Sequence, residues 1–116
     1  MAIEPFVKEL VDDGQYQSIM KPPVTHGMRS GRVYLLPGTD CGEHTTGVHE
    51  ELLVFLTGSG TAVIGRDNKE FAVGAGQVAY IPPETPHNIK NTSDEPLSYV
   101  FCVAPVDVGE NEDESA

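Results

Sequence analysis

The sequence has few basic residues, few cysteines and no long apolar run. Only 7 lysines and arginines accompany 18 acids, which leaves a net charge of −11. Because proteins that bind phosphate backbones need a basic surface, this balance argues against nucleic acid as a partner. Two cysteines are too few for a disulfide scaffold. No stretch approaches the ~20 apolar residues of a membrane span, so we expect no membrane partner.

The N-terminus likewise lacks the apolar run of a signal peptide. Together with Cys41 and Cys102, expected as free thiols, this predicts a cytoplasmic protein. A length of 116 residues suits one domain with one core. We expect an N-terminal arm with the first strands over residues 1–28, a barrel over 29–105, and a disordered acidic tail over 106–116.

Helix signals are scarce, and only residues 5–11 could form a short helix, with a proline in the first turn and a glycine as stop. Elsewhere, glycines and prolines separate short apolar runs, a pattern typical of an all-β sandwich or barrel. The runs are residues 16–20, 32–36, 52–57, 61–65, 70–73, 77–81, 87–90 and 97–104.

The run of residues 52–56 is apolar throughout, so both faces of this strand should be covered. One face would meet the barrel interior. The other would meet either a second subunit, since symmetric dimers are the commonest oligomers, or the N-terminal segment of the same chain. The first of these two covers would make the protein a homodimer, which is the oligomeric state that we expect.

Two segments carry the residues most suited to chemistry. Side chains alternate between the faces of a strand, so His49 and Glu51 share a face with the core residues Leu53 and Phe55. Glu51 therefore looks into the barrel, where a carboxylate without a cationic partner is costly. His87 follows a turn stiffened by three prolines. With His44, these side chains could converge on a divalent metal ion.

The same residues give the chain its resemblance to the cupin superfamily. The spacing of the first cupin motif is matched by Gly38, His44, Glu51 and Gly58. The spacing of the second motif is matched by Gly76, Pro82, His87 and Asn91. The resemblance implies a small cupin-type double-stranded β-helix, or jelly-roll barrel, that binds a metal.

The chain departs from the cupin motifs at two positions. Thr46 stands where the family has its second histidine, and Glu84 stands where the second motif has glycine. The usual three-histidine, one-glutamate set is thereby reduced to a two-histidine, one-carboxylate triad with open positions. We expect His49 to act as the fourth ligand; the alternatives are that the position stays open and that the metal is lost. The change to Glu84 should alter only the turn and can place a carboxylate at the pocket mouth.

Cupins of this type use Fe, Mn, Ni, Cu or Zn for dioxygenase, isomerase or lyase chemistry on small oxygenated molecules. The resemblance therefore implies such a cofactor, a small-molecule substrate or ligand, and Glu51 as a residue that also moves a proton. A non-catalytic binding or sensor module and a metal-free structural cupin are the alternatives. Fold alone does not choose among them.

Several further residues could have either a functional or a purely structural role. Cys41 could approach the metal, although a buried small residue is the more common role. Three tyrosines, which could donate hydrogen bonds in the cavity or simply pack in the core, are Tyr34, Tyr80 and Tyr99. Arg29 and Arg32 could bind a substrate carboxylate, but solvated strand edges are the commoner position for arginine.

Overall fold

The computed structural model describes residues 2–106, and all of their regular structure is β-strand. The strands are β1 (Gln17–Met20), β2 (Arg29–Leu35), β3 (His44–Thr45), β4 (His49–Thr57), β5 (Ser59–Ile64), β6 (Lys69–Gly74), β7 (Val78–Ile81), β8 (Pro86–Lys90) and β9 (Leu97–Pro105). Within this range no helix has the length and apolarity to cross a membrane. The acidic tail predicted over 106–116 lies outside the described residues, apart from Val106.

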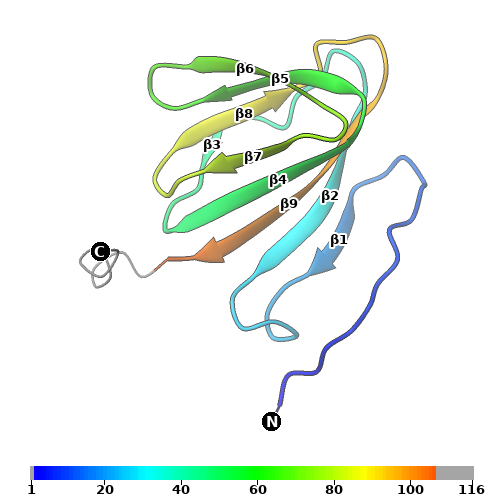
Figure 1. Cartoon of the computed structure of the whole chain (residues 1–116), viewed down its shortest axis with the longest axis vertical. Helices are drawn as coiled ribbons and strands as arrows, with labels where there is room; N and C mark the ends of the chain where they lie inside the picture. Colours follow the sequence, from blue (N-terminus) through cyan, green and yellow to red (C-terminus); the bar gives the residue numbers. More distant parts are fainter. Residues whose placement is uncertain (1, 107–116) are drawn as a thin grey trace.

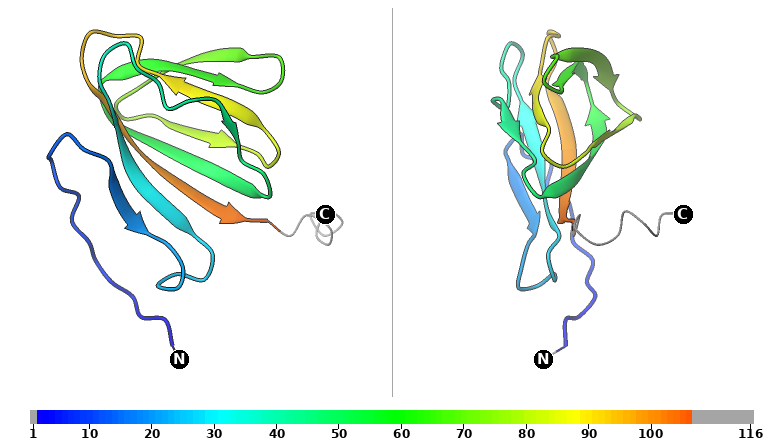
Figure 2. Two further views of the ribbon diagram at one scale, coloured as in Figure 1. Left: turned by 180° about the vertical axis from the view of Figure 1, so that it is seen from behind. Right: turned by 90° about the vertical axis from the view of Figure 1, so that its left-hand side faces the viewer.

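The strands form two antiparallel sheets that face each other (Figures 1 and 2). One sheet has five strands in the order β1-β2-β9-β4-β7, and the other has four in the order β3-β8-β5-β6. Strands distant in sequence are therefore neighbours, as in the pairing of β4 with β9. The arrangement confirms the predicted all-β, double-sheet barrel.

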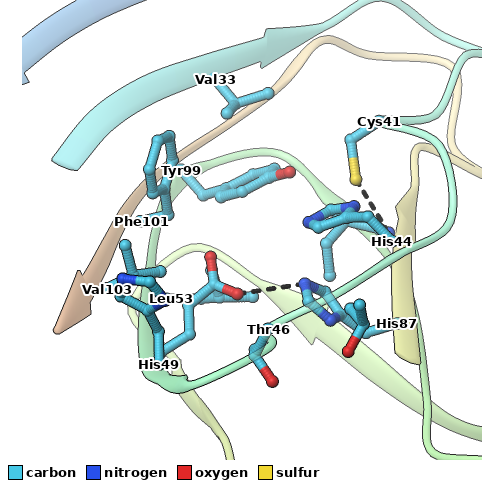
Figure 3. A pocket seen from close by; sticks show the side chains of 13 residues that line it. Val33, Cys41, His44, Thr46, His49, Leu53, His87, Tyr99, Phe101 and Val103 are labelled. Atoms are coloured by element: carbon cyan, nitrogen blue, oxygen red, sulfur yellow. Dashed lines mark hydrogen bonds and ion pairs between the residues drawn. The ribbon is translucent and has the colours of Figure 1, made fainter. Parts of the chain in front are cut away.

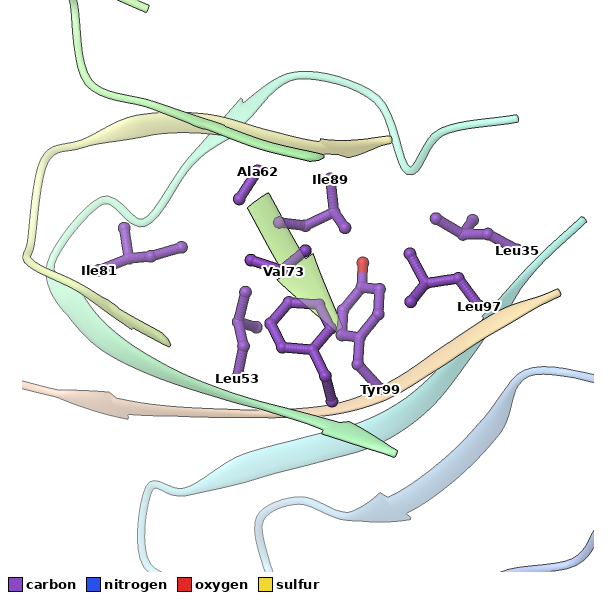
Figure 4. Close-up of a cluster of buried hydrophobic side chains, with 9 residues drawn as sticks. Leu35, Leu53, Ala62, Val73, Ile81, Ile89, Leu97 and Tyr99 are labelled. Carbon is purple, nitrogen blue, oxygen red and sulfur yellow. The ribbon is translucent and has the colours of Figure 1, made fainter. Parts of the chain in front are cut away.

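The hydrophobic core fills the space between the two sheets (Figure 4). Its buried members are Leu35, Leu53, Phe55, Ala62, Val73, Ile81, Ile89, Leu97 and Tyr99. On β4 the side chains alternate, with Glu51, Leu53 and Phe55 buried and the intervening residues more exposed. Alternation of this kind is what a strand with one face toward a core requires.

The short helix considered for residues 5–11 is wrong, because this segment is an extended arm without regular structure. Backbone groups of Glu9 and Val11 bond to residues outside the segment. The Gln17 side chain accepts a hydrogen bond from the Val11 amide at 2.7 Å and donates one to the Glu9 carbonyl at 3.0 Å. A helix of so few residues is marginal on its own, so these contacts decide the conformation.

Arg32 ties the arm to the barrel. Its guanidinium Nη2 donates to the carbonyl oxygens of Val11 at 2.7 Å and Gln15 at 3.0 Å, and it lies 3.4 Å from the Asp13 carboxylate. The side chain is buried, so neither a solvated position nor a role in binding substrate describes it. A buried arginine needs such partners to offset the loss of its hydration.

The outer face of β4 is not covered by the arm, which corrects one of the two alternatives for residues 52–56. Leu52 is 44% exposed and Leu56 is 38% exposed. The arm runs beside β1 and β2, at the opposite side of the five-stranded sheet from β7 (Figure 1). Leu53 and Phe55, on the inner face, are buried as predicted.

Candidate metal centre

His44 and His87 are brought together by the pairing of β3 with β8. The two residues are direct partners in the antiparallel register. Their ring centroids are 4.2 Å apart with an interplanar angle of 62°. The proline-rich turn between β7 and β8 precedes His87, and the restricted backbone of proline helps to hold the entry into β8. The two imidazoles therefore come from neighbouring strands of one sheet.

A backbone carbonyl orients each of these imidazoles. Nδ1 of His44 lies 2.9 Å from the carbonyl oxygen of Gly42, and Nδ1 of His87 lies 3.1 Å from that of Thr85. Because a carbonyl oxygen only accepts, each Nδ1 carries the proton and donates it. The Nε2 atom of each ring is left for another partner, which is the usual arrangement of metal-binding histidines.

Glu51 reaches the same point from the facing sheet. Its Oε1 lies 3.0 Å from Nε2 of His87, an interaction that ends at His87 as a dashed line in Figure 3. Both side chains are buried. The potential ligand atoms of His44, Glu51 and His87 all lie within 4.8 Å of one another. Two imidazoles and one carboxylate in such a group match the predicted three-ligand set.

The contact with Glu51 changes the acid–base behaviour of His87. Burial acts to lower the pKa of His87, because it disfavours the charged imidazolium. The hydrogen bonds to Glu51 and the Thr85 carbonyl, together with the Glu51 charge, outweigh burial, so the pKa of His87 is raised overall. With both ring nitrogens donating, the imidazolium and the carboxylate neutralise each other inside the barrel.

A cavity of about 300 Å³ adjoins the three residues. The apolar side chains around it come from strands of both sheets: Val33, Leu53, Ile89, Phe101 and Val103. His44 is exposed, whereas Glu51 and His87 are buried, so the three residues span the distance from the surface to the interior. A mostly apolar concavity with a few convergent polar groups is typical of a small-molecule site.

His49 lines the same cavity but is not part of the close group. The described residues place only His44, Glu51 and His87 within 4.8 Å of one another. Figure 3 shows the His49 side chain apart from the two other rings. His49 and Glu51 lie on one face of β4, two residues apart, so their Cα atoms are separated by ~7 Å along the strand.

Thr46 stands at the position of the missing motif histidine, and its hydroxyl makes two hydrogen bonds that hold the local structure. Its hydroxyl donates to the Pro82 carbonyl at 2.8 Å and accepts from the Thr85 amide at 3.1 Å. The side chain is buried. Thr46 therefore links the segment that carries His44 to the turn that precedes His87, a role that spacing alone did not reveal.

Glu84, at the position of the missing motif glycine, keeps a glycine-like backbone. Its φ is +57°, in the left-handed region that side chains other than glycine rarely adopt. Its amide donates to the Gly47 carbonyl at 2.8 Å, which connects the two turns beside the centre. The side chain is exposed and does not line the main cavity.

Two of the further candidates, Cys41 and Tyr99, line the cavity and also pack with the core. The Cys41 sulfur accepts a hydrogen bond from the Ile89 amide at 3.4 Å and is a free thiol, as expected. Tyr80 lies on the outer face, where its hydroxyl donates to Glu50 at 2.8 Å. In the part of the chain described, Tyr34 and both candidate arginines are absent from the cavity lining.

Known proteins resemble both the sequence and the fold. An uncharacterised protein of Methanocaldococcus jannaschii is 30% identical over 105 residues, which cover 89% of this chain and 81% of the relative. A cupin protein of Bacteroides fragilis has a similar structure, with a TM-score of 0.76, 20% identity and coverage of 92% of this chain and 90% of that one. A Thermotoga maritima protein described as a predicted oxalate decarboxylase aligns with a TM-score of 0.63 and 24% identity over 67% of this chain and 66% of that one.

The two structural similarities show a shared fold and nothing of the chemistry. The match to a family model is more specific, because the cupin domain model covers residues 31–103. This range contains most of β2, all of β3 to β8 and most of β9, and therefore all the residues of the candidate metal centre. The chain thus belongs to the cupin domain family.

Proposed function

We propose that His44, Glu51 and His87 hold a divalent transition metal ion, and that a small oxygenated molecule binds beside it in the adjoining cavity. The observation that carries the proposal is the convergence of these three ligand atoms within 4.8 Å, next to an apolar cavity. Two histidines with one carboxylate form a set that leaves coordination positions open to a ligand.

The donor groups fit such an ion chemically. Each imidazole is fixed through Nδ1. Nε2 of His44 can then offer its lone pair to an ion, and Nε2 of His87 can do so once the proton shared with Glu51 has left. A divalent cation would replace the charge of the His87 imidazolium as the partner of the buried carboxylate. Imidazole and carboxylate ligands suit Fe, Mn, Ni, Cu and Zn alike. The three ligand residues therefore indicate a divalent transition metal without selecting one element.

In an enzymatic role, a bound metal would act as a Lewis acid toward the oxygen atoms of a substrate. Glu51 would be the catalytic residue of the chain itself. Only its Oε1 is engaged within residues 2–106, so the second carboxylate oxygen is available to accept or return a proton. The apolar lining would keep water from the reacting centre. These features are compatible with dioxygenase, isomerase or lyase chemistry.

We also propose His49 as a fourth ligand, reached by rotation of its side chain. It lines the same cavity and shares the inner face of β4 with Glu51. Metal titration of a His49→Ala variant tests this role. A fourth ligand predicts weaker metal binding than in the wild-type protein, whereas unchanged binding would leave the three-residue set alone.

A metal-free cupin is a second candidate, and the Glu51–His87 contact favours it. At 3.0 Å these two groups satisfy each other without an ion. A non-catalytic binding module would use the same cavity and would differ from an enzyme only in lacking turnover. Two measurements distinguish the metal-dependent enzyme, the binding module and the metal-free cupin. They are the metal content of the protein and the conversion of a bound molecule.

Elemental analysis of protein purified without a metal-affinity tag tests the proposal. We expect a near-stoichiometric transition metal in the wild-type protein and its loss in His87→Ala. His26→Ala is the matched control, since this histidine is exposed and does not line the cavity. Full metal content in His87→Ala would refute the assigned centre, and wild-type protein that takes up no metal would support the metal-free alternative.

We further propose a cytoplasmic homodimer. The outer face of β4 and β7 exposes large apolar side chains, which favours burial against a second copy: Leu52, Leu56, Val78 and Tyr80. Light scattering after size-exclusion chromatography should give twice the mass of the chain, and Leu52→Glu should return the monomer. The two free cysteines support the location, because a reducing compartment preserves thiols.

A further inference from the structure

We propose that the cavity selects a small, mainly apolar monoanion, and that the Tyr99 hydroxyl donates the hydrogen bond that positions its oxygen end. This inference rests on the proposed metal centre and names the substrate class for it. Tyr99 is a positioning residue on β9, in the sheet that faces the strands of His44 and His87.

The hydroxyl of Tyr99 is available to a ligand. The side chain is only 3% exposed, and its ring packs against Phe55 with centroids 5.3 Å apart. Within residues 2–106 the hydroxyl bonds to the Cys41 side chain, a weaker partner than the nitrogen or oxygen atom that buried tyrosines usually have. Figure 3 shows the phenol oxygen directed toward the region of the His44 ring and Cys41.

The same hydroxyl remains a donor under all physiological conditions. Burial of the side chain favours the neutral phenol and raises the pKa of Tyr99 above its ordinary value. The phenol therefore keeps its proton and can donate it to an oxygen acceptor. The Cys41 sulfur, the polar neighbour on this side, is a weak acceptor that a ligand oxygen would replace favourably.

The charges around the cavity limit what it can hold. Neither a lysine nor an arginine is among the described residues that line it. A divalent ion bound to Glu51 would leave one positive charge uncompensated, which one negative charge on a ligand would balance. A dianion would leave an excess negative charge in an apolar cavity, and burial of an unpaired charge is costly.

The size and lining of the cavity set the remaining properties of the ligand. A volume of about 300 Å³ corresponds to ~10 water molecules at roughly 30 Å³ each, so the ligand has on the order of ten non-hydrogen atoms. Val33, Phe101 and Val103 line the part of the cavity that would surround its body. An apolar body with a single anionic oxygen group meets both conditions.

Calorimetric titration of Co²⁺-loaded protein tests the inference with two probes, 3-methylbutanoate and malonate. Both have the same number of non-hydrogen atoms, but the first is an apolar monoanion and the second a dianion. Tyr99→Phe removes only the hydroxyl and keeps the ring on Phe55. Tyr80→Phe is the matched control, because its hydroxyl lies on the outer face. Metal content is measured for every variant.

We expect 3-methylbutanoate to bind at least tenfold more tightly than malonate. Tyr99→Phe should weaken this binding about tenfold at unchanged metal content, as loss of a hydrogen bond to a charged group requires, while Tyr80→Phe should bind like wild type. Tighter binding of malonate, binding of neither anion, or full affinity in Tyr99→Phe would overturn the inference and leave the metal centre standing. Failure of the wild-type protein to take up metal would overturn both.

Discussion

Replacing Thr46 with valine should destabilise the protein, although the shape of the side chain is retained. The change removes one hydrogen bond to the Pro82 carbonyl at 2.8 Å and one from the Thr85 amide at 3.1 Å. Each such bond contributes about 1 kcal/mol net. Because Pro82 is exposed and Thr85 is only partly buried, their backbone groups can recover some hydration, and we expect a loss of about 2 kcal/mol rather than more.

Denaturant unfolding and thermal melting of the metal-free protein measure this loss. A decrease of about 2 kcal/mol corresponds to a fall in the melting temperature of about 8 °C for a domain of this size. Thr45→Val is the matched control, because this threonine is exposed and its hydroxyl makes a single hydrogen bond within residues 2–106, accepted from the Gly47 amide at 3.2 Å. The control should lose less than about 0.5 kcal/mol.

The same substitution should weaken the proposed metal centre. Thr46 joins the segment of His44 to the turn before His87, so its loss lets the two imidazoles move relative to each other. A partner that orients ligands in this way is worth about tenfold in metal affinity or more. Wild-type stability in Thr46→Val, or an equal loss in Thr45→Val, would refute the structural role given to this hydroxyl.

Two further predictions concern stability. Gly58→Ala should cost 1–3 kcal/mol more than Gly38→Ala in urea unfolding, roughly the cost of steric overlap. Both glycines have φ of +81°, but only at Gly58 would a Cβ overlap the Pro96 carbonyl oxygen; equal losses would contradict this. In EDTA-treated protein, the raised pKa of His87 makes its pairing with Glu51 stabilising below pH ~6.5 and lost as pH rises through the folded-state pKa. His87→Gln should abolish this part of the pH dependence, and a persisting slope would show another source.

The fold could be predicted because turn residues separate nearly all the strands. Each apolar run found in the sequence coincides largely with a strand, whereas β3 was not recognised. With only His44 and Thr45, β3 is too short to show alternation. It exists because its backbone pairs with β8, a contact between segments far apart in the chain. Local pattern cannot report such a long-range pairing.

The candidate site was predictable in composition but not in its internal contacts. Motif spacing and strand alternation indicated His44, Glu51 and His87, and the structure brings these three together. Nothing in the sequence indicated that the Thr46 hydroxyl is engaged by the second motif, or that Arg32 is buried beneath the arm. The hydrogen bonds of Thr46 and the burial of Arg32 both depend on which distant segment packs against each side chain. That packing is determined by the tertiary structure and not by local sequence.

The distribution of the three residues over two sheets explains why folding and the centre are linked. His44 and His87 belong to the four-stranded sheet, and Glu51 belongs to the five-stranded sheet. The group therefore forms only when the sheets close on the core between them, and opening the sheets would separate the carboxylate from both imidazoles. Without a metal, the Glu51–His87 ion pair offsets part of the cost of burying the carboxylate. With a bound metal ion, the same closure of the sheets would position three ligands. Metal binding would then increase the free energy of unfolding, because an unfolded chain presents no such site.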